Sequence, residues 1–187
     1  ETSWLKSAVP SPATVTLPRP FGSGGGGDRA PAESARGAAR QLEAKTDELG
    51  RETVAAFTPE PIQGAGGVII PPETYWPEIK RICKARNILL VADEVICGFG
   101  RLGEWFGHQY FGVEPDLAPI AKGLSSGYLP IGGVMVSDKV ADVIIGSGDF
   151  NHGFTYSAHP VAAAAALENL RIIEDDKLVE RVREDIG

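Results

Sequence analysis

The stretch Ile88-Leu89-Leu90-Val91-Ala92-Asp93-Glu94 decides the fold. Its first five residues are continuously apolar, and they follow a helical pattern that runs from Tyr75 to Asn87. Such a run after a helix is typical of a strand in a parallel sheet that is covered by helices on both faces. Asp93 and Glu94 come directly after the run. Open α/β sheets bind ligands at the carboxyl ends of their strands, so these carboxylates are candidates for function.

Further short apolar runs alternate with helical patterns along the chain. This alternation predicts the α/β class, with a mostly parallel sheet flanked by helices. Pro119 lacks an N–H group, which favours an edge position or an early end for its strand. The predicted strands cover residues 54–57, 88–92, 116–121 and 133–136, and the predicted helices cover 31–49, 75–87, 138–145 and 161–174.

Composition excludes several classes of protein. The chain has 187 residues, enough for one domain with a sizeable core. A net charge of -7 argues against binding to nucleic acid or an anionic membrane. No apolar run reaches the ~20 residues that span a bilayer. Cys83 and Cys97 lack metal-ligand spacing, which favours a reducing, cytoplasmic setting.

The beginning of the chain differs from the rest. Residues 1–50 are predicted to form a loop-rich lead-in followed by a surface helix that ends at Gly50. The glycine run 22–27 has no Lys-Ser/Thr after it and no strand before it, so a flexible loop is favoured over a phosphate loop. The chain begins at Glu1 and ends within a charged helical pattern, which we interpret as a piece of a longer protein.

Lys122 is the main candidate for chemistry. It follows the predicted strand 116–121, and burial there would favour the neutral amine, a nucleophile that forms Schiff bases with aldehydes. A surface lysine in a loop is the alternative. Asp93 favours the first interpretation, because a carboxylate that keeps the ring nitrogen of pyridoxal phosphate protonated makes the cofactor an electron sink. For Asp93 the alternative is a turn or N-cap aspartate.

Other polar residues are weaker candidates. Thr155 offers a hydroxyl and nearby backbone N–H groups to a phosphate, or it belongs to an ordinary polar turn. Glu60 is either a hydrogen-bonding partner of an active-site group or a loop carboxylate. The histidines lack the spacing of a metal site or of a Ser/His/Asp set, so we interpret them as solvated or structural: His108, His152 and His159.

Four runs together resemble the class III (ω-amino acid) aminotransferases, pyridoxal phosphate enzymes of fold type I. Their order and separations agree over roughly two-thirds of the chain, which is more specific than any single motif. The runs are Glu60-Pro61-Ile62-Gln63-Gly64-Ala65-Gly66-Gly67, Ala92-Asp93-Glu94-Val95-Ile96-Cys97-Gly98-Phe99-Gly100-Arg101, Ala121-Lys122-Gly123 and Gly153-Phe154-Thr155-Tyr156-Ser157.

The resemblance implies a role for each matching residue. Lys122 corresponds to the Schiff-base lysine and Asp93 to the partner of the pyridinium nitrogen. Val95 corresponds to the apolar residue packed against one face of the cofactor ring. Phe154 and Thr155 correspond to a loop that reaches the phosphate of the neighbouring subunit's cofactor, since the family is dimeric with shared sites.

Four further positions refine the resemblance. Glu60 corresponds to an active-site carboxylate with a supporting role. Ile96 stands where ornithine- and γ-aminobutyrate-type members carry glutamine, which favours the ω-amino acid:pyruvate branch. Pro119 and Ala158 stand where threonine and glycine are expected, so Pro119 removes a backbone donor and Ala158 is expected at a positive φ.

The resemblance implies a transaminase that moves an amino group from an ω-amino acid or amine to a keto acid such as pyruvate. The enzyme would be a cytoplasmic homodimer or dimer of dimers. Aminomutases and amino-phospholyases share the scaffold, and a non-catalytic remnant or assembly subunit is an alternative of another class. Residues 51–187 would be the central part of the large domain, without its N-terminal half or the small C-terminal domain. We therefore expect little or no activity from this chain alone.

Overall fold

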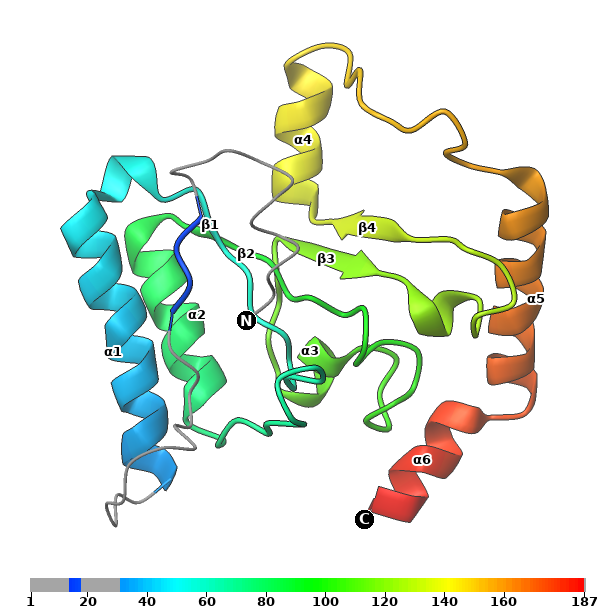
Figure 1. The fold of residues 1–187 in the computed structure, drawn as a ribbon, viewed down its shortest axis with the longest axis horizontal. Coiled ribbons are helices and arrows are strands. Elements are labelled where there is room, and N and C mark those ends of the chain that lie inside the picture. Colours follow the sequence, from blue (N-terminus) through cyan, green and yellow to red (C-terminus); the bar gives the residue numbers. More distant parts are fainter. Residues whose placement is uncertain (1–13, 18–30, 187) are drawn as a thin grey trace.

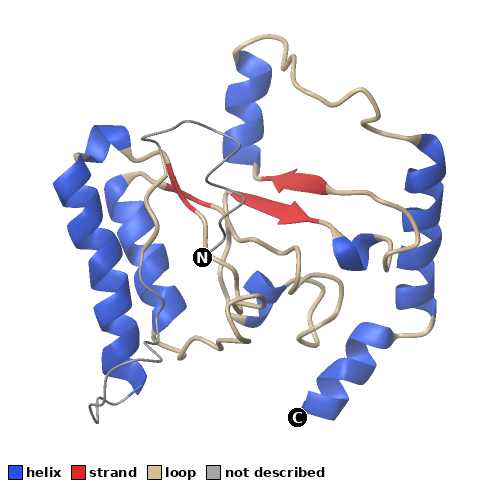
Figure 2. Ribbon diagram, viewed as in Figure 1, coloured by secondary structure: helices blue, strands red, loops and turns tan. Residues whose placement is uncertain are grey.

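The computed structural model describes residues 14–17 and 31–186, so most of the predicted lead-in, with its glycine run, lies outside the described residues. Figure 2 shows helices around a few short strands. The strands are β1 (Ala56–Phe57), β2 (Leu89–Leu90), β3 (Leu117–Ile120) and β4 (Gly133–Val136). The helices are α1 (Pro31–Leu49), η1 (Arg51–Thr53), α2 (Tyr75–Arg86), α3 (Gly107–Tyr110), η2 (Lys122–Leu124), α4 (Asp138–Gly146), α5 (Pro160–Asp175) and α6 (Leu178–Ile186).

The strands form two pairs joined by one bridge. β1 pairs in parallel with β2, and β3 pairs antiparallel with β4. A parallel bridge between Val91 and Leu117 connects the pairs, which gives the order β1-β2-β3-β4. The α/β class is confirmed, and Figure 1 shows α1 and α2 on one side of the strands and α5 on the other.

Two expectations about the strands were wrong. The run 54–57 was expected to be a buried strand, yet only Ala56 and Phe57 pair, and Ala56 is exposed. No described strand pairs with the outer edge of β1. Of the two alternatives for Pro119, the edge position was wrong, because β3 has β4 on one side and the end of β2 on the other. The strand does end one residue later, at Ile120. A proline keeps its carbonyl group, and that of Pro119 accepts the N–H of Glu94 at 3.1 Å.

The hydrophobic core lies between α1, α2 and β2. Each large apolar side chain buried there contributes roughly 1.5–3 kcal/mol relative to an exposed one. Trp76 also links the core to the loop that begins at Glu60, because its indole nitrogen donates to the carbonyl of Pro61 at 3.4 Å. The buried residues of this cluster include Ala39, Leu42, Trp76, Ile79, Ile82, Ile88 and Leu90.

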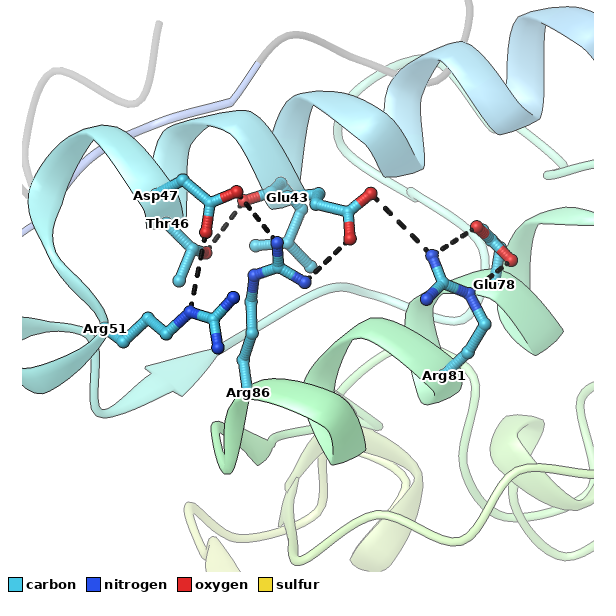
Figure 3. Close-up of polar contacts among 8 residues, drawn as sticks. Glu43, Thr46, Asp47, Arg51, Glu78, Arg81 and Arg86 are labelled. Atoms are coloured by element: carbon cyan, nitrogen blue, oxygen red, sulfur yellow. Dashed lines mark hydrogen bonds and ion pairs between the residues drawn. The ribbon is translucent and has the colours of Figure 1, made fainter.

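An arginine ties α1 to α2 on the outer side of this core (Figure 3). Arg86 donates to Glu43 at 2.7 Å and to Asp47 at 2.8 Å, and its side chain is only 7% exposed. The hydrogen bond from Arg86 is the main cause that lowers the pKa of the Asp47 carboxyl below its ordinary value of 3.8. This contribution to stability is present above the ordinary pKa and is lost as the pH falls through the lowered pKa.

None of the described helices combines the length and the apolar character needed to cross a membrane. Among the described residues, no group of three or more His, Cys, Asp or Glu side chains is arranged to hold a metal ion.

The Arg86 bridge predicts a change in the titration of Asp47. In Arg86→Gln the pKa of Asp47 should rise toward 3.8, because its strongest hydrogen-bond donor is lost. Carboxyl carbon NMR across an acid titration measures this pKa. Arg51→Gln is the control, since Arg51 lies 3.7 Å from Asp47 on a more exposed side chain. Equal shifts in the two variants would contradict the assignment.

The backbone at Ala158 predicts a stabilising substitution. Ala158 has the expected positive φ, at 57°, a conformation that costs an L-residue about 1–2 kcal/mol and a glycine much less. Ala158→Gly should therefore raise the free energy of unfolding by about 0.5–1 kcal/mol, as measured by urea denaturation. Ala163→Gly, on the exposed side of α5, should lower it by about 1 kcal/mol. A loss of stability in both variants would show that φ at Ala158 is not strained.

Candidate active site

The site begins where the chain leaves β2. Beyond that strand, the N–H of Ala92 donates to Leu117 at 3.0 Å, and the N–H of Glu94 donates to Pro119 at 3.1 Å. The N–H of Asp93, between them, points the other way and donates to Pro59 at 2.9 Å. Asp93 therefore lies between β3 and the segment that carries Glu60.

The Asp93 carboxylate is held by its own turn. Its Oδ1 accepts the N–H of Val95 at 3.1 Å, and the residue is half-buried. A carboxylate that is oriented by its backbone and still open on one side is suited to receive a cationic N–H group from a ligand. Val95 is also half-buried, and its position two residues later fixes it relative to this carboxylate.

Lys122 starts the turn η2 directly after β3. Its side chain is exposed, so the expectation of a desolvated lysine at the end of a buried strand was wrong for the chain as it stands. The chain leaves the sheet at Ala121, before Lys122, and turns outward. Lys122 also has a positive φ of 40°. A non-glycine residue holds such a conformation only when its surroundings enforce it, and this is frequent at functional sites.

Hydrogen bonds from two directions enforce that turn. The N–H of Leu124 donates to Ala121 at 2.9 Å. From α5, the side-chain amide of Asn169 donates to the carbonyl of Gly123 at 2.9 Å and to that of Leu124 at 3.1 Å. Asn169 is buried, so its two bonds fix the Lys122 turn against a rigid helix.

A cavity of about 390 Å³ brings Lys122 and Val95 together. It lies between the Lys122 turn, the loop after Asp93, and the helices α5 and α6. Its lining combines the amine of Lys122, the guanidinium of Arg101 and the hydroxyl of Ser126 with apolar side chains. The lining residues include Val95, Ile96, Phe99, Lys122, Ile173 and Leu178, whereas Asp93, Glu60, Phe154 and Thr155 are outside the lining.

Glu60 shapes the loop beside this cavity. Its Oε2 accepts the N–H of Gly64 at 2.8 Å. A side chain on Gly64 would collide with Ile96, which lines the cavity. Glu60 therefore closes a tight turn whose glycine lets Ile96 pack closely.

Phe154 and Thr155 lie elsewhere. They belong to the loop between α4 and α5, which follows the outer edge of the molecule in Figure 1, away from β3. Both are exposed, Phe154 by 82%. The N–H of Phe154 donates to Ser157 Oγ at 2.9 Å, which closes a polar turn. Within the described chain these residues are not brought to Lys122.

Two residues support the site most directly: the sequence made Glu94 a candidate without indicating its contacts, and it did not indicate Asn169. Glu94 is completely buried and accepts the N–H groups of Gly107 and His108 at 2.8 and 2.6 Å. Asn169 holds the Lys122 turn. In the sequence, Glu94 stands out only as a second carboxylate after an apolar run, and Asn169 only as one amide on an alanine-rich helix. Their partners lie 14 and 46 residues away, so the signals alone did not reveal the contacts.

Cys97 is near the site but is not a nucleophile. Burial raises the pKa of its thiol to about 11, and its Sγ lies 3.5 Å from the carbonyl oxygen of Ile62. Since the thiolate is the reactive form, a thiol that stays protonated at neutral pH is inert. Lys122 supplies the amine of the cavity lining, which also includes Arg101 and Ser126.

Comparisons with known proteins agree with this geometry. The sequence profile described as "Aminotransferase class-III" matches residues 23–186. A putrescine–pyruvate aminotransferase of Pseudomonas aeruginosa is 59% identical over 174 residues, which cover 93% of this chain and 38% of that protein. A chloroplastic gamma aminobutyrate transaminase of Solanum lycopersicum is 55% identical over 137 residues, 71% of this chain and 26% of the relative.

Solved structures give the same result for the fold. An (S)-enantioselective omega-transaminase from Thermomicrobium roseum aligns with a TM-score of 0.86 at 45% identity, over 95% of this chain and 40% of that one. The omega transaminase from Pseudomonas jessenii in complex with PMP aligns with a TM-score of 0.84 at 45% identity, over 92% and 39%. This chain spans about two-fifths or less of each of these relatives, and it belongs to the class III aminotransferase family.

Proposed function

We propose that this chain is the cofactor-binding part of a pyridoxal phosphate-dependent transaminase. The reaction transfers an amino group from an ω-amino acid or amine to a keto acid such as pyruvate. The observation that carries the proposal is the shared cavity of Lys122 and Val95, with Asp93 two residues before Val95 at the end of β2. Relatives named as putrescine–pyruvate and gamma aminobutyrate transaminases support the substrate classes.

The residues at the cavity fit the cofactor. An aldehyde needs an amine, which Lys122 supplies from a turn with a fixed backbone. A flat aromatic ring needs an apolar surface, which Val95 and its neighbours supply. A ring nitrogen that must keep its proton needs a carboxylate, and Asp93 is oriented by the N–H of Val95.

Lys122 and Asp93 have different roles in the proposed reaction. When bound, pyridoxal phosphate supplies a ring that withdraws electrons from the carbon bearing the amino group. Nζ of Lys122 would hold the cofactor through its aldehyde carbon, and as a free amine it would move a proton to or from the substrate carbon. The Asp93 carboxylate holds the proton on the ring nitrogen and keeps the ring electron-poor.

The remaining candidates act around this pair. Glu60 orients the 60–64 turn through the N–H of Gly64. Phe154 and Thr155 bind the cofactor phosphate of a neighbouring subunit, which their exposure at the outer edge of the chain allows. The same loop region exposes apolar groups, including Tyr156 by 81% and Val161 by 61%, which suits a homodimer contact.

The proposal includes the organisation and setting of the protein. Residues 51–187 form the central part of a large domain, and residues 1–50 lead into it. The homodimer, alone or as a dimer of dimers, has no nucleic-acid or membrane partner. A cytoplasmic location suits two buried cysteines, Cys83 and Cys97, neither of which forms a disulfide.

Lys122 predicts where the cofactor attaches. Pyridoxal phosphate added to the protein should give a new absorbance band, and borohydride reduction should leave the cofactor's mass on the peptide that contains residue 122. Lys122→Ala should abolish both signals. Lys139→Ala is the matched control, because Lys139 is an exposed lysine on α4 whose ion pair with Asp116 lies outside the cavity. A label on another lysine, or no band at all, would favour the non-catalytic alternative.

The Asn169 contacts predict weaker cofactor binding in a variant outside the cavity. Asn169→Leu keeps the size of the side chain but removes the donor to two carbonyls of the Lys122 turn. The two lost hydrogen bonds cost about 2 kcal/mol together, so the apparent dissociation constant for pyridoxal phosphate should rise by up to about thirtyfold. Absorbance titration measures it. Glu168→Gln, an exposed neighbour on α5, is the control and should leave the dissociation constant unchanged. An unchanged constant in Asn169→Leu would show that the Lys122 turn does not need the Asn169 hydrogen bonds.

A further inference from the structure

Glu94 is a buried carboxylate that the proposed reaction does not use. Its side chain is 0% exposed. Oε2 accepts the N–H of Gly107 at 2.8 Å, while Oε1 accepts the N–H of His108 at 2.6 Å and lies 2.9 Å from Nδ1 of the same residue. Burying a carboxylate costs a great deal of free energy unless hydrogen bonds compensate. These contacts therefore fix the start of α3 to the end of β2.

The imidazole that Glu94 holds is the first of three stacked or edge-on rings. His108 lies parallel to Phe106, with ring centroids 5.6 Å apart and an interplanar angle of 9°. Phe106 meets Phe99 edge-on, with centroids 5.5 Å apart at 67°. Aromatic pairs favour these separations and orientations, so the position of one ring constrains the next.

Phe99 ends the chain of rings at the cavity. It lines the cavity with Lys122, and it has a positive φ of 61°. Its N–H donates to Trp105 at 2.6 Å, which holds that strained backbone. A side chain on Gly123 would meet Cβ and Cδ2 of Phe99 at 3.1 Å, so Phe99 packs directly against the residue after Lys122.

We propose that Glu94 is a positioning residue for Lys122. It acts through His108, Phe106 and Phe99, which form a packed line from the buried carboxylate to Gly123. That the position of Lys122 matters for catalysis rests on the proposed function. The packing between Glu94 and Gly123 does not depend on that function. Protein interiors are close-packed, so a shift of one ring displaces the next. Catalytic side chains need support of this kind to stay within tight geometric limits.

The link also explains why Glu94 lies next to Asp93. The N–H of Glu94 donates to Pro119, three residues before Lys122, and its carbonyl accepts the N–H of Gly98 at 2.9 Å. One residue therefore joins β3 by its backbone, and its side chain holds His108, the first ring of the line that ends at Gly123. The positions of Asp93 and Lys122 therefore both depend on Glu94.

Hydrogen exchange in the cofactor-free protein tests the link. Glu94→Gln keeps the shape of the side chain, but its NH₂ group cannot accept the N–H that one carboxylate oxygen accepts. Backbone amides of residues 98–108 should exchange faster. Amides of residues 121–125 should also exchange about tenfold faster, while those of α1 and α2 stay unchanged. Glu104→Gln is the control, because Glu104 lies on the same loop but pairs with Arg183 at 3.0 Å.

Other outcomes would overturn the proposal. Faster exchange confined to residues 94–108 would show a local anchor without transmission to Lys122, and a uniform rise would show general destabilisation. If Glu94→Gln does not fold, the same exchange measurement can be made on Phe106→Leu. This variant removes the middle ring of the line and leaves the buried carboxylate in place.

Two variants of His108 separate transmission through rings from a general structural role. His108→Phe keeps a ring over Phe106 and should preserve the protection of residues 121–125. His108→Asn keeps a polar partner for Glu94 but no aromatic ring, and should lose that protection. The reverse order would contradict transmission through the rings. Because exchange needs no cofactor, failure of the wild type to bind pyridoxal phosphate would count against the proposed function alone.

Discussion

Two backbone hydrogen bonds hold the end of β2 against β3: Ala92 N–H to Leu117, and Glu94 N–H to Pro119. The rest of the site depends on them. They fix Asp93 beside β3. Since β3 ends at Ile120, only Ala121 separates this strand from Lys122. A shift of one residue would exchange the faces of the segment and turn Asp93 away. The residue types needed for cofactor chemistry are thus brought together by a short strand junction.

Contacts on both sides of this junction support it. The α1–α2 layer buries Trp76, whose indole bonds to the 60–64 segment, and Arg86 closes the outer side of that layer. On the opposite side, Asn169 of α5 fixes the Lys122 turn. Positive φ angles at Lys122 and Phe99 are unfavourable locally, and these supports maintain them. Three of the non-glycine residues with positive φ line the cavity: Phe99, Lys122 and Ser126.

The sequence predicted the features that depend on local pattern. Residues 31–49 and 161–174 are rich in strong helix formers, and α1 and α5 have nearly those bounds. The positive φ of Ala158 followed from the resemblance to glycine-containing relatives. Features that depend on distant contacts were not predictable. The exposure of Lys122 depends on where the chain leaves β3, and the Glu94–His108 contact depends on how the intervening loop folds.

The central claim is that Asp93 and Lys122 act on one cofactor ring. Pyridoxal phosphate labelled with ¹⁵N in the ring, bound to the protein and observed by NMR, tests it most directly. The account predicts the chemical shift of a protonated ring nitrogen at neutral pH, and its loss in Asp93→Asn while the cofactor remains attached to Lys122. An unprotonated nitrogen in the wild-type protein, or a protonated one that persists without the Asp93 carboxylate, would contradict the account.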